Sequence, residues 1–322
     1  MQTILNITNG DCAVQIMQKA NIAGSFLPWR DVLHDGPVPA NLSLEALSKV
    51  RAQFLASLGW GEFEKINANF IERDNTLKAH DNYSKVILWF EHDLYDQLQL
   101  LQILDWFSNN LSNTTELFII CTEQYLGRTS PEQMQNLMAH ITPVTSKHLC
   151  LAKKAWAAFR SPTPESWFKL LSQDTSLLEF LNGAILRQLE EYPSSINGLS
   201  RTAHTALNII NEGEIKPAKL FGRYIQTEER VFLGDLSFWQ TLNTFLNAPS
   251  PLIKLNKGSK LTLAATSDQR ISITETGKAI LNAQKNWLNI ININYWIGGV
   301  ELTTLNYWVW DNKTQSINNA SG

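Results

Sequence analysis

Polar and charged side chains gather directly after the apolar runs that we expect to form strands. They are Asn9 and Asp11 after the first run, Arg30, Asp31, His34 and Asp35 after the second, Glu91, His92 and Asp93 after the third, and Glu123 after the fourth. In an open parallel sheet the loops after the strands meet at one edge, where ligands bind. The pattern predicts a small-ligand site there, with Asn9, Asp11, Arg30, Asp31 and Asp35 as ligand-binding residues.

Metal binding is one chemistry that this edge would support. His34, Asp35, His92 and Asp93 offer imidazole and carboxylate ligands suited to zinc, manganese or iron. No HxH or HExxH spacing accompanies them, so the ligands would have to meet through the fold. A purely structural interpretation stays open, because Asp11 and Asp93 each precede an expected helix and aspartate there often serves as the N-cap. The sequence identifies no metal and no cofactor.

Catalysis is the alternative. His92, Glu91, Asp93 and His34 would then serve as catalytic acids and bases, with Arg30 holding an anionic substrate, as in a metal-assisted hydrolase. This interpretation predicts an enzyme, whereas the previous one predicts a binding protein.

Cys12 suggests a nucleophile, because a strand, Gly-Asp-Cys and a helix follow one another in a way that is similar to the Gly-Asp-Ser element of some esterases. A helix N-terminus favours a thiolate, whereas the neighbouring Asp11 opposes it. The Asp-x-x-His pair of those esterases lies near the C-terminus, but here Asp31 and His34 come far too early. We therefore expect Cys12 to be a small, half-buried residue without chemistry. A classical nucleotide loop is also not expected, since this first loop has only Gly10.

Short apolar runs alternate with helical patterns in the front third of the chain. The expected strands are Thr3–Thr8, Ser25–Trp29, Lys85–Phe90 and Glu116–Cys121, and the expected helices are Cys12–Ala20, Ser43–Leu58 and one that ends at Phe107. Buried strands separated by helices predict a Rossmann-like α/β domain with a parallel sheet over residues 1–128. Residues 129–192 are expected to be helical and to pack on it, with helix starts at Ser130-Pro131 and Thr163-Pro164.

The C-terminal part predicts a winged-helix-like module over residues 200–311. Tyr192–Leu199 has the composition of a domain linker. Three helices are expected next, then short strands, then a closing helix that runs from Glu275 to about Trp287. The helices are Ser200–Asn211, Lys216–Ile225 and Asp235–Leu246, and the strands are Leu252–Leu255, Lys260–Ala264 and Arg270–Thr274. A hairpin about Gly298-Gly299, with Tyr307–Trp310 alongside, and a flexible tail over 312–322 complete the prediction.

This module predicts a DNA or protein partner. Residues 1–199 hold 15 lysines and arginines against 21 acids, whereas residues 200–287 hold 11 against 7. Lys254, Lys257 and Lys260 lie on the expected wing, where they would contact nucleic-acid phosphates. The expected recognition helix, Asp235–Asn247, contains no lysine or arginine and offers only amides such as Gln240 to bases, which favours a protein partner.

Long motifs resemble those of one bacterial family, the domain-of-unknown-function family eighteen-thirty-five. They are Asn9-Gly10-Asp11, Trp29–Pro39 (WRDVLHDGPVP), Leu88–Leu98 (LWFEHDLYDQL), Trp156–Pro162, Asn197–Thr202 and Phe232–Asp235. The resemblance implies an arrangement of the fold and no activity. Cys12 departs from the serine that the family often has at this position, which argues against a mechanism that needs a hydroxyl there.

Bulk composition limits the class of protein. With 44% hydrophobic and 18% charged residues the chain is globular. Three cysteines without a CxxC pair indicate a reducing compartment, and the N-terminus lacks the pattern of a signal peptide. No apolar run is long enough to span a bilayer. We therefore expect a soluble, cytoplasmic protein without a membrane partner, acting as a regulator or sensor or, alternatively, as an enzyme.

Overall fold

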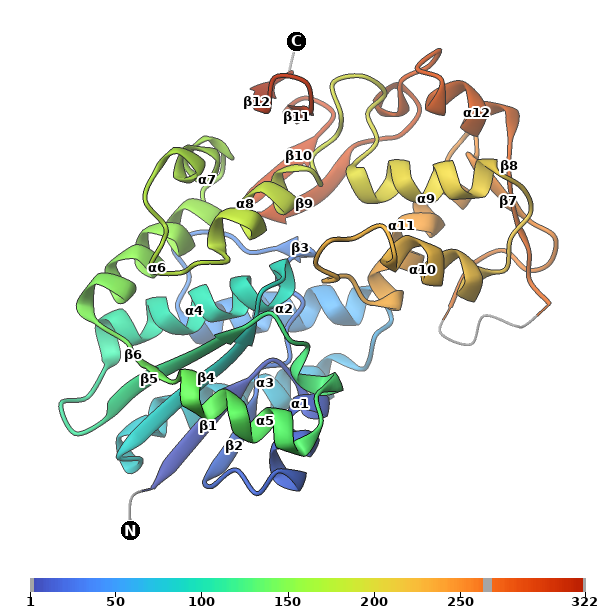
Figure 1. Cartoon of the computed structure of the whole chain (residues 1–322). Helices are drawn as coiled ribbons and strands as arrows, with labels where there is room; N and C mark the ends of the chain where they lie inside the picture. The colour runs from blue at the N-terminus through green and yellow to red at the C-terminus, as the bar shows by residue number, and fades with distance from the viewer. Residues whose placement is uncertain (1–2, 263–267, 321–322) are drawn as a thin grey trace. The chain divides into compact units, whose positions relative to one another are not determined.

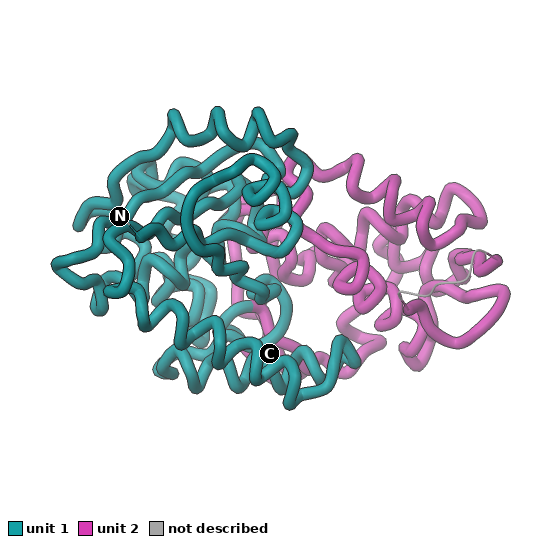
Figure 2. Tube along the Cα trace, turned by 90° about the horizontal axis from the view of Figure 1, so that it is seen from below, with its two compact units in different colours: residues 1–185, 298–300 teal, residues 186–297, 301–322 magenta. Residues whose placement is uncertain are grey.

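Two compact units make up the chain in the computed structural model, which describes residues 3–262 and 268–320 (Figure 2). Unit 1 comprises Met1–Ile185 and Gly298–Val300, and unit 2 comprises Leu186–Ile297 and Glu301–Gly322. Among the described residues no helix is both long and apolar enough to cross a membrane.

The mixed α/β class predicted for the front of the chain is confirmed in unit 1 (Figure 1). Its five-stranded sheet has the order β2-β1-β4-β5-β6. The first four strands are parallel and β6 pairs antiparallel with β5. The strands are β1 (Ile4–Thr8), β2 (Ser25–Pro28), β4 (Lys85–Glu91), β5 (Glu116–Thr122) and β6 (Thr142–Pro143), with a separate short strand β3 (Gly36–Pro37). The antiparallel edge strand β6, two residues long, was not predicted.

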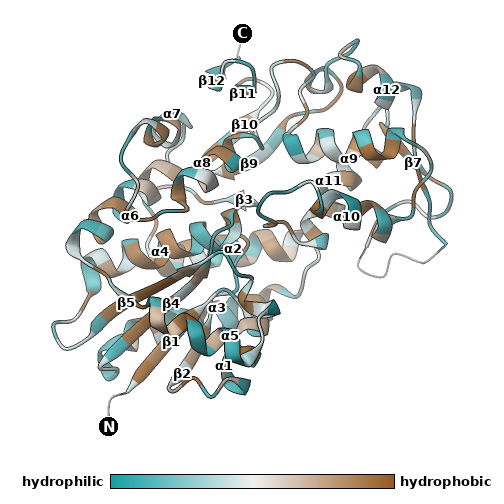
Figure 3. Ribbon diagram, in the orientation of Figure 1, coloured by the Kyte–Doolittle hydropathy of each residue, from teal (hydrophilic) through white to brown (hydrophobic). Residues whose placement is uncertain are grey.

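Helices cover this sheet because its strands are apolar on both faces, as the brown strands of Figure 3 show. One face presents Ile87, Trp89 and Ile120 to α1 and α5. The opposite face packs against α4, where Trp29 Nε1 donates to Gln102 Oε1 over 2.9 Å. The helices of unit 1 are α1 (Asp11–Lys19), α2 (Leu44–Ser57), α3 (Phe63–Lys78), α4 (Leu94–Asn110), α5 (Pro131–Asn136), α6 (Ser146–Phe159) and α7 (Glu165–Lys169), and α8 (Leu181–Leu189) continues into unit 2.

Of the two N-caps predicted for residues 129–192, one is confirmed and the other is wrong. Ser130 caps α5 in a capping box with Gln133, as its sequence predicts. Thr163 does not cap α7, whose N-cap is Pro164 without a side-chain hydrogen bond. The 16-residue helix α3 was not anticipated.

Unit 2 contains the three predicted helices followed by a pair of antiparallel strands. The helices are α9 (Arg201–Asn211), α10 (Pro217–Ile225) and α11 (Asp235–Leu246), and the strands are β7 (Ile253–Leu255) and β8 (Ile271–Ile273). An isolated bridge joins Ile215 to Ile271, on the other side of β8 from β7. Then follow α12 (Glu275–Leu281), β9 (Asn294–Gly298), β10 (Val300–Thr303), β11 (Trp308–Asp311) and β12 (Ser316–Asn319).

Several boundaries in unit 2 differ from the predictions. The expected linker is a packed loop, in which buried Asn197 donates to the carbonyl of Ile280. Residues 260–262 form no strand, and 263–264 lie outside the described residues. The other two expected strands are present as β7 and β8, which pair with each other. The closing helix ends at Leu281, and the expected flexible tail contains β12, which pairs with the aromatic strand β11.

Candidate functional site

The candidate site of unit 1 lies where the strand order reverses. β1 is followed in the chain by β2 on one side of it, whereas the next strands of the sheet, β4 and β5, lie on its other side. The loops after β1 and β4 therefore leave the sheet in different directions, and in open α/β sheets ligands bind in the crevice between such loops. Asn9 directly follows β1 and Glu91 ends β4 at this position.

Three buried carboxyl groups meet at this point. Glu91 ends β4, Asp93 follows it, and Asp96 lies in the first turn of α4. One oxygen from each lies within 4.8 Å of the others, and the three residues are at most 4% exposed. No lysine or arginine among the described residues forms an ion pair with any of them. The cluster must therefore hold protons or a cation.

The side-chain amide of Asn9 joins the two loops through this cluster. Asn9 Nδ2 donates to Glu91 Oε1 over 2.7 Å and to Asp96 Oδ2 over 2.9 Å. The backbone of Leu126, in the loop after β5, also donates to Glu91 Oε1 over 2.7 Å. Tyr95 Oη donates to the carbonyl of Asn9 over 3.1 Å. Three strand ends thus contribute to one hydrogen-bonded centre.

Burial raises the pKa of every carboxyl group in the cluster. It raises the pKa of Glu91, although hydrogen bonds from Asn9 and Leu126 oppose this. Burial and the nearby charge of Glu91 raise the pKa of Asp93 to about 8. Burial, Asp93 and Glu91 together raise the pKa of Asp96 well above its usual range. Carboxyl groups of this kind are protonated near neutral pH, unless a cation replaces the protons.

Two further sets of polar groups at this edge of the sheet lack hydrogen-bond partners in the described structure: the hydroxyl of Thr8 and the first backbone amides of α1. Thr8, the last residue of β1, is fully buried, and its Oγ1 has no hydrogen-bond partner among the described residues. The helix α1 begins after Gly10 without a side-chain cap, and a Cβ at Gly10 would meet nothing within 4 Å. The first turn of α1 therefore presents free backbone amides at an open position.

Arg30 and Asp11 lie on the exposed side of this edge. They form a two-point ion pair, with nitrogen–oxygen distances of 2.7 and 2.6 Å. The guanidinium holds the pKa of Asp11 below its usual range through this hydrogen bond. Asp11 opens α1 and is not its N-cap, whereas Asp93 is the cap of α4 and accepts from the backbone of Asp96. The structural interpretation of the sequence thus holds for Asp93 alone.

Asp31 and Asp35 belong to a loop that a buried arginine organises. Arg51, which is fully buried, bonds Asp31 Oδ1 over 2.9 Å and also donates to the carbonyls of Val32 and Asp35. His34 Nε2 lies 3.7 Å from Asp35 Oδ2, and its ring contacts Tyr95. Asp31 thus has a structural partner that its sequence position did not reveal.

His92 and Cys12 stand apart from the carboxyl cluster. The ring of His92 packs against Tyr125 and Phe180, at centroid distances of 5.2 and 5.9 Å. Neither His34 nor His92 belongs to the group of potential metal ligands among the described residues. Cys12 is exposed at the start of α1 and has no hydrogen-bonded base in the described part of the chain.

The site residue that sequence reasoning missed is Asp96. The sequence contained an indication of its role. Asp93 and Asp96 are three residues apart at the start of α4, and this spacing places both carboxylates on the same face of the helix.

In unit 2 the three predicted phosphate contacts are exposed, but Lys257 is paired with Asp268 over 2.6 Å. On α11, Gln240 is exposed, whereas the amide of Asn243 exchanges two hydrogen bonds with the backbone of Leu261. The helix therefore has fewer amides available to bases than its sequence offers.

No family model matches the chain, and no curated protein matches it either. Membership of the family of unknown function therefore stays a prediction from the motifs.

Proposed function

We propose that unit 1 binds a small ligand where the loops after β1 and β4 separate, and that a divalent cation is part of what it binds. The observation that carries this proposal is the convergence of Glu91, Asp93 and Asp96, with one oxygen of each within 4.8 Å of the others, all buried and none in an ion pair in the described structure. Carboxylate and amide oxygens are the ligands that magnesium, manganese and calcium prefer.

The ligand atoms that meet in the structure suit a hard cation, such as magnesium or calcium, better than the histidine-containing set predicted from the sequence does. The histidine-containing set of His34 and His92 would favour zinc, whereas the converging groups are three carboxylates with an amide beside them. Thr8 Oγ1, at the end of β1, is a further oxygen at this edge without a hydrogen-bond partner in the described part of the chain. A cation here would replace the protons that the raised pKa values otherwise impose.

Asn9 would act as the cover of the site. In the structure its NH2 group faces Glu91 and Asp96. A rotation of the amide by half a turn would instead direct Oδ1 to the cluster, as a cation requires. The open position at Gly10 and the free amides of α1 would accommodate the anionic part of a ligand, with Arg30 nearby.

Calorimetric titration of the full chain with magnesium, manganese and calcium tests the proposal. We expect saturable binding that Glu91→Gln weakens by at least about tenfold, since one charged ligand is lost while both hydrogen bonds to Oε1 can be kept. Glu123→Gln is the matched control, because Glu123 is an exposed acid after the neighbouring strand β5. Absence of binding by all three ions, or equal effects of the two variants, would overturn the proposal.

An enzymatic role is the second candidate, and the raised pKa of Asp93 favours it. A carboxyl group with a pKa of about 8 is protonated at neutral pH and suits a general acid. Asp93→Asn would then abolish turnover while it leaves ligand binding within a few fold. If Asp93→Asn and Glu91→Gln instead weaken binding in parallel and no turnover is found, the binding role stands alone.

For unit 2 we propose a winged-helix-like module that contacts a macromolecular partner. The support is the order α9, Ile215, α10, α11, β7, β8, in which three helices precede two antiparallel strands and Ile215 bridges β8. Ligand binding by unit 1 would regulate that contact. Partner affinity measured with and without the bound cation tests this coupling, and an unchanged affinity would exclude it.

A further inference from the structure

Unit 1 has a pocket towards the C-terminal end of α4, away from the carboxyl cluster. Its volume is about 450 Å³, within the range of about 300–1,000 Å³ that is usual for small-ligand sites. Asp105 lines it and lies roughly 13 Å along the helix from Asp96, so the pocket is separate from the cluster. The helices α4 and α6 supply most of its polar side chains: Gln102, Asp105, Trp106, Trp156 and Arg160.

An acid and a base share this pocket without bonding to each other. Asp105 is half-buried, and its carboxylate has no hydrogen bond or ion pair in the described structure; Ser108 bonds only its backbone carbonyl. Arg160 donates through Nε and Nη2 to the carbonyls of Pro39 and Leu42, which leaves Nη1 unbonded. Burial raises the pKa of Asp105 and lowers the pKa of Arg160. Both charged groups are therefore partly desolvated, with some of their bonding capacity unused.

Two further donors in the wall of this pocket are unbonded. Trp156 is 3% exposed and Gln102 is 4% exposed. Gln102 Oε1 accepts from Trp29, but Gln102 Nε2 and Trp156 Nε1 have no hydrogen-bond partner among the described residues. The structure does not seal these two donors from solvent. A ligand in the pocket could therefore accept hydrogen bonds from them.

The charges of the pocket balance. Lys78 and Glu45, which also line it, form an ion pair with each other. Asp105 and Arg160 remain, one negative and one positive, so the pocket suits a ligand without net charge. Leu42 and Leu44, both half-buried, add apolar surface to the wall.

We propose that this pocket binds a free α-amino acid with an apolar side chain. The ammonium group of the amino acid bonds the carboxylate of Asp105. Its carboxylate accepts from Arg160 Nη1, with Gln102 and Trp156 as further donors. Its side chain packs against the apolar part of the wall. The site is independent of the proposed cation site and gives unit 1 a second ligand.

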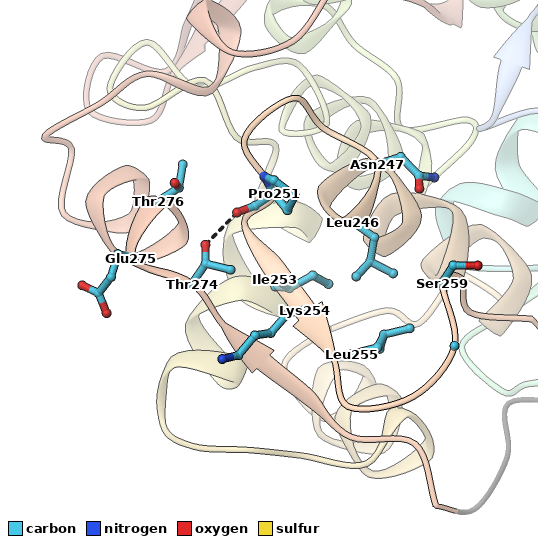
Figure 4. Close-up of a pocket in the computed structure, with 11 residues that line it drawn as sticks. Leu246, Asn247, Pro251, Ile253, Lys254, Leu255, Ser259, Thr274, Glu275 and Thr276 are labelled. Atoms are coloured by element: carbon cyan, nitrogen blue, oxygen red, sulfur yellow. Dashed lines mark hydrogen bonds between the residues drawn. The ribbon is translucent and has the colours of Figure 1, made fainter.

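The larger groove of unit 2, with a volume of about 670 Å³, fits this class of ligand less well (Figure 4). Thr274 Oγ1 donates to the Pro251 carbonyl over 2.7 Å, and Glu275 is paired with Lys278 over 2.8 Å. Of the charged residues that line the groove, Lys254 has no ion pair among the described residues. A groove with an unpaired cation and no unpaired acid does not match both ends of an amino acid.

Thermal unfolding of the full chain with each common amino acid tests the proposal, because a bound ligand raises the unfolding temperature. Calorimetric titration then compares leucine with leucinamide, which lacks the carboxylate, and with N-acetylleucine, which lacks the ammonium group. We expect saturable binding of leucine. Both derivatives should bind at least about tenfold more weakly, because each leaves one charged group of the pocket without a partner.

Asp105→Asn should weaken leucine binding by at least about tenfold. The fold should be kept, because the carboxylate bonds no described residue. Asp81→Asn is the matched control, since Asp81 is an exposed acid of the segment before β4 and does not line the pocket. Glu91→Gln should leave leucine binding within a few fold, which separates this site from the proposed cation site.

Absence of stabilisation by every amino acid would overturn the proposal. Binding of N-acetylleucine as tight as that of leucine, or an affinity that Asp105→Asn leaves unchanged, would do the same. Neutral sugars such as glucose are titrated beside the amino acids, because hydroxyl groups also bond carboxylates and amides. Binding of a sugar without binding of any amino acid would overturn the amino-acid assignment and make the pocket a site for a different class of ligand.

Discussion

Asn9 Nδ2 lies 2.7 Å from Glu91 Oε1, and this hydrogen bond joins the loops that leave β1 and β4 in different directions. The residues are 82 positions apart in the chain. The same amide reaches Asp96 over 2.9 Å, so one neutral side chain holds two acids that would otherwise repel each other.

The stability of the cation-free protein should fall as pH rises from about 4 to 8. The folded state raises the pKa of Asp93 from 3.8 to about 8, so it binds a proton that the unfolded chain has released. The stabilisation is complete below the unfolded pKa and is lost as pH rises through the folded one, at about 1.4 kcal/mol per pH unit for one such group. Urea unfolding of wild type and Asp93→Asn checks this. The variant keeps an N-cap and should show a flatter profile, and identical profiles would contradict it.

Replacing Asn9 by aspartate should destabilise the protein in a pH-dependent way. Asn9→Asp is nearly isosteric but places a fourth carboxyl group against Glu91 and Asp96. We expect a loss on the order of 2 kcal/mol at pH 8, largely recovered at pH 5, where the carboxyl groups are protonated. Thermal unfolding at the two pH values measures it. The exposed Asn110→Asp is the control, and an equal effect there would mean that crowding of charge at the cluster is not the cause.

The ion pair between Arg51 and Asp31 should be essential to unit 1. Arg51→Ala leaves a buried carboxylate without its partner, which costs about 3–5 kcal/mol. Lys78→Ala removes the exposed pair with Glu45 and should cost less than about 1 kcal/mol. Denaturant unfolding of both variants checks the difference. Comparable losses would show that the arginine does not organise the loop after β2.

One substitution should have opposite effects at two glycines of unit 2. A Cβ at Gly277 of α12 would lie 2.3 Å from the Leu252 carbonyl, whereas nothing lies within 4 Å of one at Gly222 of α10. Gly277→Ala should therefore destabilise by about 1–3 kcal/mol, because the backbone before β7 must move. Gly222→Ala should stabilise by up to about 1 kcal/mol through helix propensity. Hydrogen exchange of unit 2 amides measures both, and a neutral Gly277→Ala would refute the packing argument.

The sheet of unit 1 and the strand ends that carry its candidate site were predictable, because both follow from the hydrophobic pattern of the sequence. Buried runs such as Lys85–Glu91 stop at polar residues, and parallel strands bring those ends to one edge. The identity of the converging carboxyl groups was harder to predict from the sequence. The chain bends at His92 and Asp93, directly after β4, so strand alternation did not predict which of these side chains meet: Glu91 and Asp93 share the cluster, whereas His92 packs against Tyr125.

The wrong predictions in unit 2 have their cause in contacts between residues far apart in the chain, which local composition does not reveal. The turn-forming stretch before α9 looked like a linker, yet Asn197 is fixed by the carbonyl of Ile280, 83 positions away. The closing helix stops at Leu281, and Ala283 then adopts a left-handed backbone that its sequence does not announce.

The most direct test of the central claim is the number of protons released when manganese binds. Calorimetric titrations at pH 7 in two buffers with different heats of ionisation give this number. The raised pKa values of Glu91, Asp93 and Asp96 predict that binding releases protons and that Glu91→Gln reduces both the release and the affinity. Binding without proton release, or release that Glu91→Gln leaves unchanged, would show that the cation binds somewhere other than the carboxyl cluster.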